Sequence, residues 1–167
     1  MSALKKTKVD LLDSLKSFSE RTIKDMIFPV KPQKGDAEQI YRCPAVYEMR
    51  LPDSTSAMRK APYILHQVLT GSDVQSPGKS TESDTVIRSI FCVYSDDEQE
   101  GALMLLNLME RILIQLLRER VLDNQFELDL DQKLESLIYP DNTAPFFAGE
   151  MVSVWKLPAV EREIQYE

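Results

Sequence analysis

The 167-residue chain has few of the residue types on which common kinds of protein chemistry depend. It holds one histidine, two cysteines and five glycines. One histidine and two distant cysteines do not make a zinc site, nor do they staple a small secreted domain. The glycines do not stand at the spacing of a phosphate-binding or dinucleotide-binding loop. We therefore expect no metal and no cofactor.

Long apolar runs are also missing. Residues 1–6 are not followed by an apolar segment, so we expect no signal peptide. No stretch approaches the roughly 20 apolar residues that span a bilayer, so we expect no membrane partner. Normal apolar content, 43%, speaks against disorder and for one soluble domain over residues 1–167 in a reducing compartment.

Basic charge is scarce, and it is unevenly distributed. Lysine and arginine number 20 against 27 aspartate and glutamate, a formal charge of 20 − 27 = −7. Residues 1–60 carry 12 basic and 8 acidic side chains (+4), whereas residues 61–167 carry 8 and 19 (−11). An acidic chain does not favour binding to a nucleic-acid backbone. The uneven distribution can be incidental, or it can allow unlike parts of two copies to meet.

Hydrophobic periodicity predicts an α+β fold. Apolar residues recur at helical spacing over residues 7–27, within an N-terminal region of residues 1–30, and Thr7 with Asp10 forms a capping pattern. A long central helix is predicted over residues 95–121, with a capping box from Ser95 to Glu98. We expect an antiparallel or mixed sheet of about five or six strands, with both helices packed on one face. The strand patterns cover residues 45–51, 63–70, 85–94, 125–128, 134–139 and 151–157, and residues 159–167 form an extended tail.

The segment 71–84 predicts a long flexible hairpin loop with almost nothing to bury. Such a loop can be a mobile tip, or it can become ordered against a partner. The candidate partner-docking residues are Gly71, Asp73, Pro77, Gly78, Lys79 and Asp84.

The central helix has more apolar residues than one core-facing stripe requires. Its main stripe is predicted to contain Ala102, Leu105, Leu106, Met109, Ile112, Leu113, Leu116 and Leu117. Four further apolar residues and one arginine lie outside this stripe. They form the candidate oligomer interface: Leu103, Met104, Leu108, Arg111 and Ile114. Either the first helix or a loop of the same chain covers this flank, or another subunit does.

Candidate catalytic groups are sparse. His66 could pair with Cys43 or Cys92 as a nucleophile, but no nucleophile motif surrounds them, so a polar strand residue and two core thiols are expected. The acidic residues around Asp97 lack the spacing of a calcium-binding loop and are explained by helix capping. The residues therefore predict an assembly or interaction protein rather than an enzyme.

Two stretches of the chain resemble small neck and tail proteins of long-tailed phages and prophages. The first is residues 88–112, in which a strand leads into the helix start Asp96-Asp97-Glu98-Gln99-Glu100-Gly101. The second contains Tyr139-Pro140-Asp141, an aromatic–Gly–Glu run at residues 145–150, and residues 154–163 with the sequence Val-Trp-Lys-Leu-Pro-Ala-Val-Glu-Arg-Glu. The resemblance covers roughly the C-terminal half of the chain.

The resemblance implies a tail terminator, also called a tail completion protein, with no catalytic residues. In that family an α+β subunit forms a hexameric ring that caps the tail tube, ends its polymerisation and offers a docking surface to the head connector. The implied partners are further copies of the chain, the tail tube protein, possibly the sheath, and head–tail connector proteins, while DNA crosses the lumen without specific binding. The protein would reside in the virion tail or neck after assembly in the host cytoplasm.

Three alternatives remain open. A head-completion (stopper) or other neck-collar protein belongs to the same apparatus, and contractile-tailed phages and tail-like bacteriocins use related subunits. A non-viral acidic adaptor or binding domain is the second alternative. An enzyme of unfamiliar type, using His66 or the acidic residues, is the third.

Overall fold

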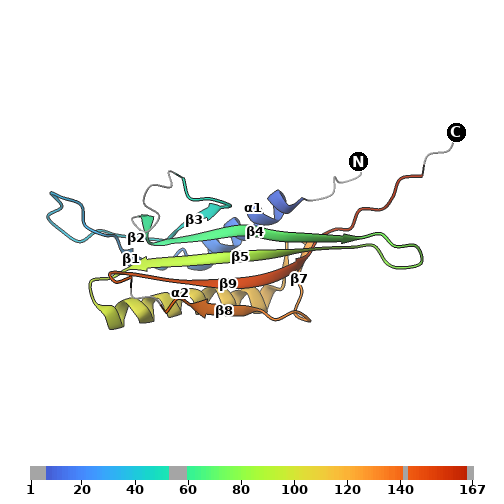
Figure 1. The fold of residues 1–167 in the computed structure, drawn as a ribbon. Helices are drawn as coiled ribbons and strands as arrows, with labels where there is room; N and C mark the ends of the chain where they lie inside the picture. The colour runs from blue at the N-terminus through green and yellow to red at the C-terminus, as the bar shows by residue number, and fades with distance from the viewer. Residues whose placement is uncertain (1–6, 53–59, 141–142, 165–167) are drawn as a thin grey trace.

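The computed structural model describes residues 7–52, 60–140 and 143–164, and within them it confirms the α+β fold with a mixed sheet (Figure 1). The helices are α1 (Lys8–Ile23) and α2 (Glu98–Glu119). The strands are β1 (Phe28–Pro29), β2 (Tyr41–Arg42), β3 (Ala45–Glu48), β4 (Tyr63–Val74), β5 (Glu82–Tyr94), β6 (Val121–Leu122), β7 (Phe126–Leu128), β8 (Glu135–Ile138) and β9 (Phe146–Lys156).

The main sheet has the order β3-β4-β5-β9-β7-β6, and β8 pairs with β9 on the same edge as β7. The pairing of β3 with β4 is parallel, and the other pairs are antiparallel. Strands β1 and β2 form a separate two-stranded ribbon. The pattern of alternation missed β1, β2 and β6, because two residues are too few to show a period.

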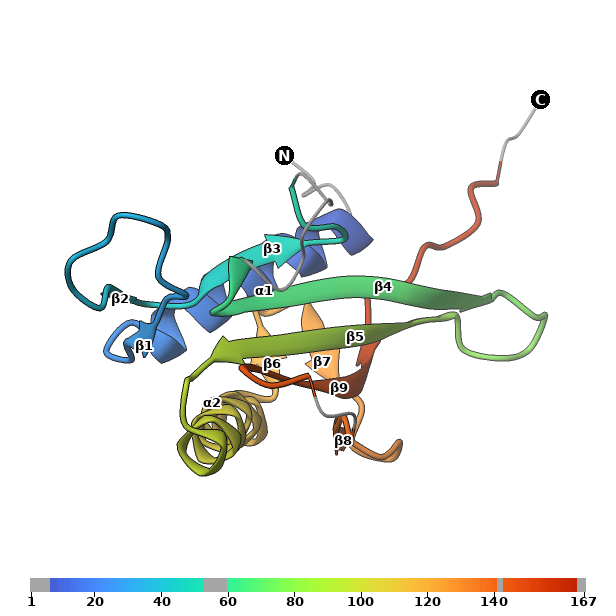
Figure 2. The ribbon, with the colours of Figure 1, turned by 60° about the vertical axis from the view of Figure 1, so that its left-hand side comes forward.

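Both helices pack on one face of the sheet, as predicted. Alternate residues of the long strands point to them, including Ile87 and Phe91 of β5 and Met151 and Trp155 of β9. The sheet curls around the helices, so that α1 contacts β3 near one end of the strand order and β6 at the other (Figure 2). A smaller cluster, which includes Tyr63, Leu65, Cys92, Tyr94 and Phe146, lies apart from this core.

The N-terminal cap is confirmed, and the predicted cap of the central helix is wrong. Thr7 and Asp10 form a reciprocal capping box at the start of α1. At α2 the cap is Asp97, whose carboxylate accepts from the backbone N–H of Glu100 at 2.9 Å. Ser95 is buried, and its own N–H donates to the carbonyl of Pro145 at 2.9 Å, so it still belongs to the sheet side of the turn.

The predicted loop at 71–84 is mostly strand. Strands β4 and β5 stay paired out to Val74 and Glu82, which leaves residues 75–81 as the connection. The hairpin therefore projects as a ribbon beyond the core (Figure 1). Sequence patterns do not predict this extension of β4 and β5, because the projecting residue pairs bury little surface and do not alternate between apolar and polar side chains. Thr85 reinforces the ribbon, since its hydroxyl donates to the carbonyl of Thr70 at 2.6 Å.

Candidate functional site

The solvent-facing ridge of α2 is apolar. Four large aliphatic side chains are 41–59% exposed on it, although they stand on a long helix with a complete core face. They are Leu103, Leu106, Ile114 and Leu117. Their positions follow steps of three, eight and three residues, which keeps them within one stripe of the helix surface. We call these four residues the α2 ridge.

Leu108 does not belong to this exposed surface, so its place in the predicted interface is wrong. Its side chain is 0% exposed and belongs to the main core, and Met104 is half-buried against that core. Conversely, Leu106 and Leu117 were expected in the core and lie outside it. The buried stripe is instead formed by Gly101, Leu105, Leu108, Met109, Ile112 and Leu116.

The physical reason is a rotation of α2 about its axis. Apolar residues cover about two-thirds of the circumference of this helix, so periodicity alone leaves several rotations possible. Helix α1 packs on one flank of α2 and selects the rotation in which Leu108 faces the core. The sequence left two alternatives open for this flank, cover by the same chain or by another subunit, and each applies to different residues. The chain itself covers Leu108 and part of Met104, while Leu103 and Ile114 stay exposed.

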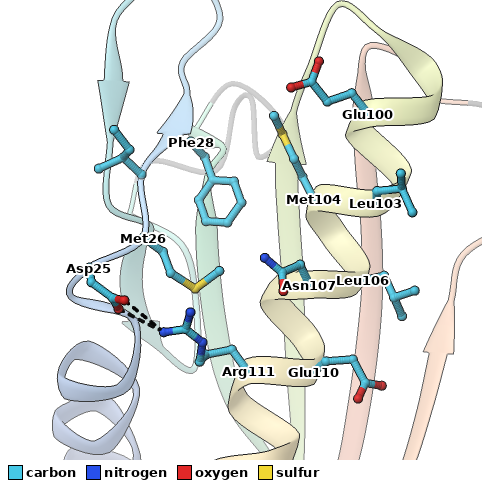
Figure 3. A pocket seen from close by; sticks show the side chains of 11 residues that line it. Asp25, Met26, Phe28, Glu100, Leu103, Met104, Leu106, Asn107, Glu110 and Arg111 are labelled. Atoms are coloured by element: carbon cyan, nitrogen blue, oxygen red, sulfur yellow. Dashed lines mark hydrogen bonds and ion pairs between the residues drawn. The ribbon is translucent and has the colours of Figure 1, made fainter.

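An open groove of about 820 Å³ lies between the end of α1 and the N-terminal half of α2 (Figure 3). Met26 and Phe28 form its wall on the α1–β1 side, and Leu103 and Met104 line it from α2. Glu100 stands at one end of the groove, beside Met104. We call this the α1–α2 groove.

Arg111 closes the other end of the groove. Its guanidinium lies 3.0 Å from the carboxylate of Asp25, which joins α2 to the segment after α1. A second ion pair, Arg21 with Glu119 at 3.1 Å, joins the two helices further along, and it raises the pKa of Arg21 and lowers that of Glu119. Arg111, predicted as an interface residue, is thus engaged within its own chain, although its side chain remains 41% exposed.

The apolar surface continues on the other flank of α2. Leu137 and Ile138 of strand β8 are half-exposed there. A smaller cavity of about 240 Å³ lies between α2 and β8, lined by residues that include Leu106, Leu113 and Leu137. The sequence did not indicate this contribution of β8, because its proximity to α2 arises only from pairing with β9.

The predicted docking residues fall into two groups. Pro77, Gly78 and Lys79 lie at the exposed tip, where Gly78 has φ +76° and the N–H of Lys79 closes a turn to Ser76. The other three are strand residues within the ladder, which corrects their placement in a loop: Gly71, Asp73 and Asp84. Partial burial, followed by the nearby carboxylates of Asp129 and Glu82, raises the pKa of Asp84.

His66 lies inside the core. Its ring nitrogens are 2.8 Å from the hydroxyl of Ser19 and 2.7 Å from that of Ser89, and the residue is 1% exposed. Burial lowers the pKa of His66 to about 4, so the ring is neutral at physiological pH. This arrangement is that of the polar strand residue expected from the sequence, with both nitrogens satisfied.

The other candidate chemical groups lie apart. Cys92 is buried in the smaller cluster, and burial raises its pKa to about 12. The thiol of Cys43 is half-buried and donates to the carbonyl of Ile23, and desolvation raises its pKa. In the part of the chain that the structure describes, no three metal-ligating side chains are grouped to hold an ion.

No family model matches the chain, and no curated protein matches it. Within the described ranges, no helix combines the length and apolarity needed to cross a membrane.

Proposed function

We propose that this protein is a structural virion component, a tail terminator that assembles into a ring, caps the tail tube and ends its polymerisation. The assignment to a phage tail depends on the resemblance of residues 88–112 and 139–163 to neck and tail proteins. The assignment to an assembly-forming protein depends on the surface of α2. No reaction is proposed, since His66 and Cys92 are buried among core residues.

The α2 ridge is the observation that carries self-association. Fully burying one large aliphatic side chain stabilises by about 1.5–3 kcal/mol. Four such residues, each about half-exposed, leave roughly 3–6 kcal/mol of apolar burial unused in the isolated chain. A stripe of this kind on a long helix marks a contact surface, whereas single exposed leucines are ordinary.

A closed ring requires two different complementary faces on each subunit. Strand β3 lies on one side of the fold, while α2 and β8 lie on the opposite side (Figure 1). Charge is divided unevenly along the sequence as well, +4 for residues 1–60 against −11 for residues 61–167. Unlike sides of this kind suit a head-to-tail contact between neighbouring subunits.

The projecting β4–β5 hairpin suits the second part of the proposed role, contact with the tail tube or the head connector. Its tip is mostly exposed and polar, with three hydroxyl side chains and one lysine within residues 75–81. The ribbon is long enough to stand clear of the two helices (Figure 2).

Deletion of the gene from the phage that encodes the protein tests the proposal. We expect tails of abnormal length, or tails that do not join heads, measured by electron microscopy of lysates. A complementing copy of the wild-type gene is the control, and it restores normal virions. Normal virions from the deletion strain would contradict the proposal.

The same experiment separates the alternatives within the neck. Tails of normal length that fail to attach to heads indicate a stopper or collar protein instead of a terminator. Flanking genes give independent support, namely a portal and connector upstream and a tail-tube or sheath gene downstream. Their absence, together with normal virions, favours a non-viral acidic adaptor.

A further inference from the structure

The C-terminal segment 158–164 forms an arm that leaves the body of the protein (Figure 1). The last ladder bond before it joins the N–H of Leu157 to the carbonyl of Ser83 at 2.8 Å, and Pro158 has no N–H with which to continue the ladder. Two further bonds anchor the arm to the hairpin. Gln75 donates to the carbonyl of Val160 at 2.5 Å, and Thr81 donates to the carboxylate of Glu161 at 3.1 Å.

The anchoring leaves the apolar side of the arm in solvent. In an extended segment alternate side chains point to opposite sides. The carboxylate of Glu161 faces the hairpin, so alternation along an extended arm would turn the side chains of Val160, Arg162 and Ile164 to the other side. Val160 is 57% and Ile164 67% exposed, so both branched aliphatic side chains are free to contact another molecule.

The α1–α2 groove has the length and chemistry to receive this side of an arm. Four extended residue steps, from Val160 to Ile164, cover about 13 Å. The groove wall from Leu103 to Arg111 follows eight helical residues and is about 12 Å long. The lining of Met26, Phe28, Leu103 and Met104 is apolar, and methionine adapts readily to an incoming side chain.

Charge is complementary as well. Arg162 stands between the two aliphatic residues of the arm and has no ion pair among the described residues. Glu100 stands at the end of the groove beside Met104, and its carboxylate has no ion pair among the described residues (Figure 3). An arm lying in the groove would therefore bring Arg162 to Glu100 while it buries Val160 and Ile164.

The arm and the groove of one chain lie at opposite ends of the molecule. The arm follows the hairpin end, whereas the groove lies at the end where α2 begins and β1 stands, in both views (Figures 1 and 2). A chain thus presents its arm away from its own groove. Contact between the two surfaces then has to join two copies head to tail, the type of contact that closes into a ring or continues into a filament.

We propose that the arm of one copy, residues 158–164, docks in the α1–α2 groove of the next copy, with Val160 and Ile164 in the apolar part and Arg162 paired with Glu100. This inference deepens the proposed function and rests on its premise that the protein self-associates. It names the two surfaces that meet, which the apolar ridge alone does not.

Sedimentation of the full-length chain and its variants tests the arm. We expect the double variant Val160→Asp/Ile164→Asp to lower the self-association constant at least ten-fold. The matched control is Glu163→Ala on the other side of the arm, which is expected to change the constant by less than two-fold. Circular dichroism unchanged from wild type shows that both variants are folded.

A charge exchange tests the pairing. Arg162→Glu and Glu100→Arg are each expected to weaken association several-fold, and the double variant to restore it. A mixture of the arm-deficient variant with Leu103→Glu, in which each is monomeric alone, is expected to form dimers and nothing larger, because only one intact junction is available.

The outcomes separate this inference from the proposed function. Wild-type association in the Val160→Asp/Ile164→Asp variant overturns arm docking and leaves the ring to other contacts, while the phenotype of the gene deletion still tests the terminator. A wild-type chain that is monomeric both alone and on tail tubes overturns arm docking and the ring together.

Discussion

At the scale of single residues, the hydrogen bonds from Ser19 to His66 to Ser89 join α1 to β4 and β5. A neutral histidine has one donor and one acceptor nitrogen, so one serine donates to the ring and the other accepts from it. The imidazole is buried away from water, which disfavours its positively charged form. His66 therefore gives the fold a defined dependence on pH.

We expect stability to fall as pH decreases from about 6.5 to about 4. The unfolded chain takes up a proton near the ordinary pKa of 6.5, whereas the folded chain resists it until about 4. The stability contributed by neutral His66 is thus complete above pH 6.5. It is lost at about 1.4 kcal/mol per pH unit, on the order of 3 kcal/mol in all. Urea unfolding at a series of pH values measures it.

His66→Gln is the control for this pH dependence, because it keeps hydrogen-bonding groups at the site but does not titrate there. The variant still contains the carboxylates, so the difference between the two pH profiles isolates the histidine. Parallel profiles for wild type and variant would contradict the assignment.

At the scale of the element, α2 both packs into the core and presents an apolar surface to solvent. One side completes the core beneath β5 and β9, and the other carries the α2 ridge and a wall of the α1–α2 groove. Because the helix is apolar on both sides, neighbouring leucines differ in burial from one position to the next. Leu108 is 0% exposed, whereas Leu103, five residues earlier, is 59% exposed.

The pair Leu103→Glu and Leu108→Glu tests this division of α2. We expect Leu108→Glu to lower the free energy of unfolding by about 3 kcal/mol or more, since it places a charge in the apolar core. Leu103→Glu is expected to change it by less than about 0.5 kcal/mol and to weaken self-association instead. Denaturant unfolding and sedimentation measure the two effects. If Leu103→Glu unfolds the protein, or Leu108→Glu does not, the rotation assigned to α2 is wrong.

At the scale of the whole molecule, charge is divided unevenly along the sequence, +4 for residues 1–60 and −11 for residues 61–167. The proposed junction adds one charge pair between copies, Arg162 with Glu100, since Arg111 of the groove is already paired with Asp25 of its own chain. The other two docked side chains, Val160 and Ile164, are apolar. Assembly should therefore depend on burial more than on ion pairing, in contrast to a ring held by charges along its rim.

We expect 1 M salt to weaken self-association by no more than about five-fold relative to 0.1 M. The Debye length falls from about 10 Å to about 3 Å over this range, and an exposed ion pair is worth at most about 1 kcal/mol. Sedimentation of the wild-type chain at both ionic strengths measures the ratio, and the neutral Arg162→Gln variant should lose the salt dependence. A ring that dissociates fully in 1 M salt would indicate a contact dominated by charge.

Local patterns account for much of the fold. The α+β class, the cap of α1 at Thr7, and the approximate positions of β4, β5, β9 and α2 follow from periodicity and capping chemistry, which act between residues close in sequence. The expected burial of Cys92 follows from its place in an apolar strand. The polar residues at 71–84 predicted a loop and this was wrong, because the two strands of a projecting ribbon pair through their backbones without burying side chains.

Features that depend on contacts between distant segments became apparent only in the folded chain. The rotation of α2 depends on α1 beside it, the groove requires Met26 and Phe28 to face Met104, and the position of the arm depends on the hairpin that holds Val160 and Glu161. The sequence shows which residues are apolar, and the period at which they recur indicates which of them share one face of a helix or strand. Which apolar face remains open to a partner is settled by packing, because the chain covers one flank of α2 with its own first helix and leaves the other in water.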